Sequence, residues 1–118
     1  MPKTVIHLFH DDPDSLRTGS HVAERVRQVA AEQGVALEVF IFGPAQAALT
    51  DASDAAHILD YNAQIDDLVA AGVPVGACLN ASRGAGSEEV LGARGLTLQY
   101  ARDAFVRWTQ ESATVISF

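Results

Sequence analysis

The stretch GVPVGACLNASRGAG, residues 72–86, decides the predicted fold. Its first half, VPVGACL at 73–79, is an apolar run typical of a buried strand. Its second half, 80–86, is rich in small residues and glycine, which predicts a loop. Cys78, the only cysteine, lies near the point where the strand gives way to the loop. Because ligands and reactive groups collect at the carboxyl ends of parallel strands, we expect any chemistry at this point.

Apolar runs and helical patterns alternate on either side of this stretch. Asp12 before Pro13 predicts the start of a helix, and Gly19 on its inner side predicts close packing on a sheet. The pattern predicts one α/β domain over 1–118, a mostly parallel five-stranded sheet with helices on both faces. Strands are predicted at 4–9, 36–42, 73–79, 96–100 and 113–118, and helices at 16–33, 45–49, 58–72, 87–91 and 101–111.

Composition excludes several classes of function. A net charge of −7 over 118 residues argues against broad contact with nucleic acid or anionic lipid. A single cysteine excludes an intrachain disulfide and a cysteine-cluster metal site, and a free thiol suits a reducing compartment. The apolar run at 4–9 is too short for a signal peptide, and no run approaches the roughly 20 residues of a membrane helix. We therefore expect a soluble, cytoplasmic protein.

Two interpretations of Cys78 remain open. The nucleophile is a thiolate, which nearby cations, helix N-termini and convergent N–H groups favour. Arg83 follows five residues later, and Gly84 and Gly86 allow the backbone to turn its N–H groups inward, whereas Glu88 opposes an anion. Alternatively, Cys78 is an inert thiol that fills the core, because free cysteine is among the most buried residue types.

Other candidate sites are weaker. His10-Asp11-Asp12 resembles half of a metal site, but no second ligand cluster supports it, so the aspartates are interpreted as helix caps and no metal is predicted. His10 would border the thiol if the first and third strands were neighbours. Neither Gly43-Pro44 nor residues 84–86 fit a phosphate-loop or dinucleotide fingerprint, so no cofactor is predicted.

At this point the chain resembles the DsrE/DsrF-like (YchN-like) family along nearly its whole length, from the 5–9 strand and the following Asp-Asp-Pro, through residues 42–45, to the carboxyl end. The most specific part begins at Cys78, and Asn80, Arg83 and Gly86 also match the family pattern. Ala81 stands where serine is common. Ala85 stands where a second arginine is common, so the thiolate has one cation fewer.

The resemblance implies a three-layer flavodoxin-like fold, assembled as trimers or hexamers. It also implies a sulfur relay, of the kind that serves tRNA thiolation or dissimilatory sulfur oxidation. Cys78 would carry sulfane sulfur as a persulfide from a donor protein to an acceptor protein, as a sulfurtransferase-like carrier. Arg83, the N–H groups around Gly84 and Gly86, and Asn80 would hold the anion, and His10 would handle a proton. The alternatives are an oligomeric module that binds a small ligand without covalent chemistry, and a thiol redox sensor.

Overall fold

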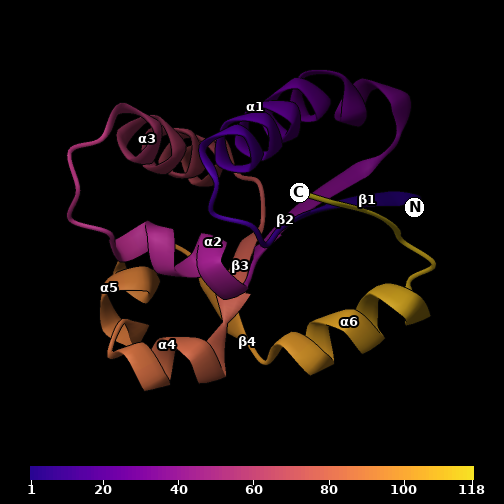
Figure 1. Ribbon diagram of the computed structural model, residues 1–118. Helices are drawn as coiled ribbons and strands as arrows, with labels where there is room; N and C mark the ends of the chain where they lie inside the picture. The colour runs from indigo at the N-terminus through magenta and orange to yellow at the C-terminus, as the bar shows by residue number, and fades with distance from the viewer.

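The structure is a computed structural model that describes all residues, 1–118, as a five-stranded parallel sheet with helices on both faces (Figure 1). The strand order is β4-β3-β2-β1-β5, and every pairing is parallel. The strands are β1 (Lys3–Leu8), β2 (Ala36–Ile41), β3 (Val75–Cys78), β4 (Thr97–Gln99) and β5 (Thr114–Ser117). The helices are α1 (Pro13–Ala30), α2 (Gly43–Ala47), α3 (Ala56–Ala70), α4 (Leu79–Ala85), α5 (Glu88–Ala93) and α6 (Ala101–Gln110), with short 3-10 turns η1 (Ala31–Gln33) and η2 (Ala48–Thr50). The three-layer, flavodoxin-like α/β fold predicted from the sequence is confirmed.

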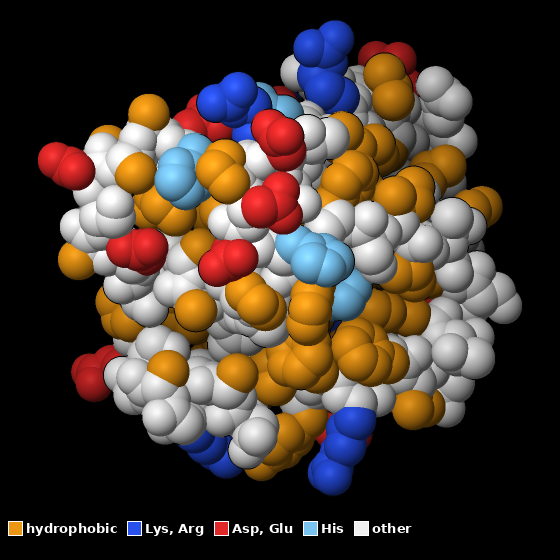
Figure 2. Space-filling model, viewed as in Figure 1, with side chains coloured by type: hydrophobic (Ala, Val, Ile, Leu, Met, Phe, Trp, Pro, Cys, Tyr) orange, Lys and Arg blue, Asp and Glu red, His pale blue; other side chains and the backbone are white.

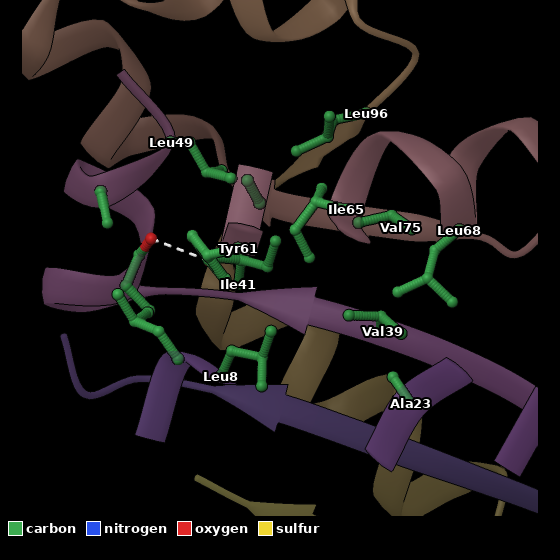
Figure 3. Packing of buried hydrophobic residues seen from close by; sticks show 14 of the residues in the cluster. Leu8, Ala23, Val39, Ile41, Leu49, Tyr61, Ile65, Leu68, Val75 and Leu96 are labelled. Atoms are coloured by element: carbon green, nitrogen blue, oxygen red, sulfur yellow. Dashed lines mark hydrogen bonds between the residues drawn. The ribbon is translucent and has the colours of Figure 1, made fainter. Parts of the chain in front are cut away.

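The larger core lies between the sheet and helices α1 and α3, which cover one face together (Figure 1). Ile41 and Val39 of β2 pack there against Ile65 and Tyr61 of α3 (Figure 3). The Tyr61 hydroxyl donates a hydrogen bond to the Ala45 carbonyl at 2.9 Å, which fastens α2 to α3. Burial of this phenol raises its pKa.

The opposite face of the sheet is covered in part by α6. A smaller core lies under this helix, in which Trp108 and Ala104 of α6 pack with Phe40 and Cys78. Beyond α6, over β2, β3 and β4, this face holds a cavity of about 640 Å³ whose lining includes Gly76. The second helical layer is therefore incomplete.

The first helix begins and packs as the sequence predicts. Asp12 is its N-cap, with its carboxylate accepting the Ser15 N–H at 3.0 Å, and Pro13 occupies the first turn. That hydrogen bond lowers the pKa of Asp12. At Gly19 an added Cβ would lie 2.4 Å from the Leu8 side chain, so glycine permits the close approach of α1 to the sheet.

The interpretation of residues 80–86 as a loop is wrong, because this segment forms most of α4. Leucine, alanine and arginine favour helix, and Gly84 is accommodated within it. Gly86, with φ 69°, ends the helix: its N–H donates to Arg83 and the Ser87 N–H donates to Ser82, a Schellman arrangement. The glycines therefore mark a helix terminus.

No helix of the molecule combines the length and apolar character needed to cross a membrane.

Candidate functional site

Cys78 lies at the junction of strand and helix that the sequence indicates. It is the last residue of β3 and the N-cap residue of α4, with an extended backbone (φ −71°, ψ 122°) and no side-chain capping bond. The residue is 4% exposed, so most of its surface packs in the core under α6. It also lines a hollow of about 380 Å³.

Two helix N-termini border this hollow. Asn80 and Ala81 of the first turn of α4 line one side, and Ala101 at the start of α6 lines another. Neither helix has a side-chain cap. Since the first amides of a helix lack partners within it and carry partial positive charge, both helix ends present positive charge to the hollow.

The cation that borders the hollow is Arg102, which the sequence reasoning missed. Arg102 and Tyr100 both line it, and the guanidinium carbon lies 5.2 Å from the centroid of the tyrosine ring. Arg102 is also paired with Asp103 at 3.4 Å and is largely exposed, so its attraction for an anion is screened by solvent. Its position just after the fourth predicted strand could have indicated this, because the carboxyl ends of parallel strands lie at one edge of the sheet.

Arg83 does not line the hollow. Its Nε pairs with Glu88 at 3.3 Å, and its Nη1 donates to the Tyr100 hydroxyl at 3.2 Å. The bond to Glu88 raises the pKa of Arg83. Arg83 therefore contacts the lining of the hollow only through Tyr100, and its charge is paired with that of Glu88.

The other predicted anion-holding residues divide into two groups. Asn80 lines the hollow, and its side-chain amide has no hydrogen-bond partner in the protein. Gly84 and Gly86 lie at the carboxyl end of α4, the opposite end from Cys78. The N–H of Gly86 is used to terminate the helix. The prediction that the glycine N–H groups surround the thiol is wrong because the segment is helical.

Gln46 makes the most direct polar contact with the site, and sequence reasoning missed it. Its side-chain Nε2 donates to the Cys78 carbonyl at 2.9 Å, and the Cys78 N–H donates to its Oε1 at 3.0 Å. Gln46 is buried on α2, 32 residues from Cys78 in the chain. The one signal in the sequence was a polar residue among the alanines of 45–48.

His10 is separated from the thiol. Its expected position required β1 and β3 to be neighbours, but β2 lies between them. His10 packs on the Phe9 ring (centroids 5.2 Å apart), and Phe9 packs on Phe42 (5.9 Å), which lines the hollow. Two aromatic rings thus intervene, so proton transfer by His10 has no direct geometric support.

His7 lies in the aromatic cluster beneath α6. Its ring centroid is 5.7 Å from that of Phe105 and 5.9 Å from that of Trp108, and its Nδ1 lies 3.1 Å from the Ser117 hydroxyl. Its Nε2 is buried without a partner. Burial, with a smaller contribution from the charge of His10, lowers the pKa of His7.

The face of the molecule seen in Figure 2 combines charge and apolar area. Figure 2 shows acidic and histidine side chains on the upper and central part of this face, with apolar side chains below them. No group of three or more histidine, cysteine, aspartate or glutamate side chains is arranged to hold a metal ion. The chemistry that the site offers is therefore that of a thiol bordered by helix N-termini, an amide and an arginine.

The chain as a whole matches a known protein family. The DsrE/DsrF-like family profile matches residues 3–118, and the chain is a member of that family. Small parallel α/β domains of this family are associated with sulfur relay. No significant match is found among curated proteins.

Solved structures share the fold. The ychN protein of E. coli superposes with a TM-score of 0.73 at 22% identity, with both chains fully covered. A protein of unknown function from Methanobacterium thermoautotrophicum gives 0.70 at 23% identity, also with full coverage of both chains. A conserved protein of unknown function from Bacteroides thetaiotaomicron gives 0.76 at 14% identity, covering 98% of this chain and 94% of its own.

Proposed function

We propose that this protein is a cytoplasmic sulfur carrier that holds sulfane sulfur as a persulfide on Cys78 and passes it to a partner thiol. The observation that carries the proposal is the position of Cys78, in a hollow that the N-termini of α4 and α6 both border. Membership of the DsrE/DsrF-like family supports the same chemistry. Helix N-termini favour a thiolate and, after sulfur transfer, a persulfide anion.

The transfer is a pair of exchange steps without net oxidation. The Cys78 thiolate attacks the outer sulfur of a donor persulfide, a new S–S bond forms, and the donor leaves as a thiolate with the electron pair of the broken bond. The proton of the donor persulfide stays on the outer sulfur during the exchange, so the charge balances. The new persulfide then releases this proton to solvent, becomes the anion that the site holds, and takes a proton up again before the second exchange. An acceptor thiolate then attacks that sulfur, and Cys78 leaves as a thiolate.

The residues around Cys78 have separate roles in this proposal. Asn80 has a free side-chain amide that can donate to the outer sulfur. Arg102 supplies positive charge at the rim of the hollow. Arg83 contributes indirectly, through its bond to the hydroxyl of Tyr100. The lone cysteine suits a relay because no second thiol of the chain competes for the carried sulfur.

We also propose a homo-oligomer, a trimer or a hexamer, that works with donor and acceptor proteins. Two surfaces support assembly. The cavity of about 640 Å³ leaves part of the sheet uncovered by helix. The edge strand β5 exposes Val115 (41%) and Ile116 (43%), and an apolar edge of this kind pairs readily with another chain. Light scattering after size exclusion measures the mass in solution. A trimer or hexamer is expected, and a monomer would contradict this part of the proposal.

Mass spectrometry of the intact protein tests the carrier function. After incubation with a cysteine desulfurase and cysteine, the wild type should gain one sulfur atom, and the Cys78→Ser variant should gain none. Loss of the adduct on treatment with a reducing thiol would identify it as a persulfide. If no adduct forms and iodoacetamide reacts with Cys78 no faster than with free cysteine, the proposal is wrong.

A second candidate is a binding module without covalent chemistry, which the cavity of about 640 Å³ favours because its size suits a small ligand. Under this alternative, Cys78→Ser leaves ligand binding and oligomer size unchanged. A redox sensor would instead give a sulfenic acid or an intersubunit disulfide with mild peroxide, visible on a non-reducing gel.

A further inference from the structure

Gln46 completes the hydrogen bonding of the sheet beside Cys78. The β2–β3 ladder continues through the pair Ile41 and Ala77, after which β2 ends and the chain turns into α2. The next main-chain groups of β3, those of Cys78, have no strand residue opposite them on this side. The side-chain amide of Gln46 takes that place, with bonds of 3.0 Å from the Cys78 N–H and 2.9 Å to its carbonyl.

This contact fixes a residue at which the chain changes conformation. Cys78 is extended (ψ 122°), and Leu79 begins α4. A main chain held at both N–H and carbonyl has little freedom to rotate, so the Cα–Cβ bond of Cys78 keeps one direction. Gln46 is itself held, since it is buried (5% exposed) and both polar atoms of its side-chain amide are bonded to Cys78.

We propose that Gln46 is the positioning residue for the sulfur chemistry of Cys78. It acts through the main chain, keeping the thiol at the N-terminus of α4 and in the hollow that Arg102 borders. This inference rests on the proposed carrier function, but it concerns geometry that a separate measurement detects. A side-chain amide suits this position because the two bonds need a donor and an acceptor on one planar group.

The test compares two variants that each remove hydrogen bonding from the α2 region. Gln46→Met keeps a side chain of similar length and loses both bonds to Cys78, whereas Tyr61→Phe loses the bond to Ala45 and leaves Cys78 untouched. We expect Gln46→Met to slow persulfide formation by about tenfold and Tyr61→Phe to stay within about twofold of the wild type. Equal rates for Gln46→Met and Tyr61→Phe would overturn the inference.

A second readout, the rate of alkylation, reports the electrostatic potential at the Cys78 sulfur and does not depend on sulfur transfer. Iodoacetate is an anion and iodoacetamide is neutral, and the ratio of their rates cancels changes in accessibility and thiolate content. The wild type should favour iodoacetate more than free cysteine does. Gln46→Met should return the ratio to that of free cysteine, while Tyr61→Phe should not. An unchanged ratio in Gln46→Met would contradict the inference.

The two readouts separate the possible failures. If the wild type takes up no sulfur but Gln46→Met still changes the alkylation ratio, the carrier function fails and the positioning role holds. If sulfur uptake occurs and Gln46→Met alters neither readout, the positioning role fails alone.

A glutamate variant keeps the inference testable if Gln46→Met does not fold. A protonated carboxyl offers one donor and one acceptor, as the amide does, whereas an ionised one offers no donor to the Cys78 carbonyl. Relative to the wild type at the same pH, Gln46→Glu should have a near-normal alkylation ratio when the carboxyl is protonated and lose it on ionisation. A ratio equal to that of free cysteine while the carboxyl is protonated would contradict the inference.

Discussion

Glu38 on β2 accepts a hydrogen bond from the indole N–H of Trp108 on α6 at 3.0 Å. The same carboxylate accepts two bonds of 2.8 Å from Arg107 and one of 3.1 Å from Lys3. Glu38 is buried, so this network joins the inner face of α6 to the sheet. Because the N-terminus of α6 borders the Cys78 hollow, the position of that wall depends on a contact at the other end of the helix.

Acid should weaken the attachment of α6. Burial of Glu38 opposes ionisation, but hydrogen bonds from Arg107, Trp108 and Lys3 outweigh it and lower the pKa to about 2. Since the folded-state pKa lies below the ordinary 4.5, the stabilisation is present above about pH 4.5 and is lost as the pH falls toward about 2. Urea unfolding across this range should show a loss on the order of 2 kcal/mol.

The variant Glu38→Gln isolates this contribution. It should lower the free energy of unfolding by about 3 kcal/mol at neutral pH, because Arg107 and Lys3 lose their buried partner. It should also remove much of the acid dependence between about pH 4.5 and 2. A variant with the full wild-type acid dependence would show that other carboxylates cause it.

His7 should make the protein less stable in mild acid. Its pKa is lowered in the folded state by burial, so below the ordinary value of 6.5 the unfolded chain binds a proton that the folded chain resists. The free energy of unfolding should therefore fall as the pH drops below about 6.5. His7→Phe keeps an aromatic ring between Phe105 and Trp108 and should remove this dependence. If the two proteins show parallel curves from pH 7 to pH 5, His7 is not the group responsible.

The arginines near the site should differ in effect. Arg102 lines the hollow, whereas Arg83 is paired with Glu88 away from it. Arg102→Gln should slow alkylation of Cys78 by iodoacetate by about twofold to threefold and leave iodoacetamide nearly unaffected, because the exposed charge acts through screened attraction. Arg83→Gln should change either rate little. A larger effect of Arg83→Gln than of Arg102→Gln would show that Arg83 is the principal cation near Cys78. Added salt should reduce the effect of Arg102→Gln.

The fold could be predicted because its signals are local. The apolar runs around Val5 and Val39 and the capping pair Asp12-Pro13 depend on neighbouring residues, and the structure reproduces them within a few positions. Cys78 could be placed at the end of a strand for the same reason.

The surroundings of Cys78 depend on contacts between distant residues. No local pattern shows that Gln46 bonds to a main chain 32 residues away. Two arginines follow strands that end at the same edge, and Glu88 and Tyr100 determine which of them is diverted from the hollow. Glycine was the ambiguous local signal, because a loop and the end of a helix both use it.

Gly84→Ala tests whether residues 80–86 are helical, and Gly19→Ala is its matched control in a closely packed helix. Gly84 lies within α4 with nothing within 4 Å of an added Cβ, so Gly84→Ala should stabilise the protein by about 0.5–1 kcal/mol through helix propensity. At Gly19 the added Cβ would approach Leu8 to 2.4 Å and Phe118 to 3.0 Å. Gly19→Ala should therefore destabilise by about 1–3 kcal/mol despite the same gain in propensity. Urea denaturation of both variants measures the difference, and a Gly84→Ala variant less stable than the wild type would indicate that residues 80–86 are not helical in solution.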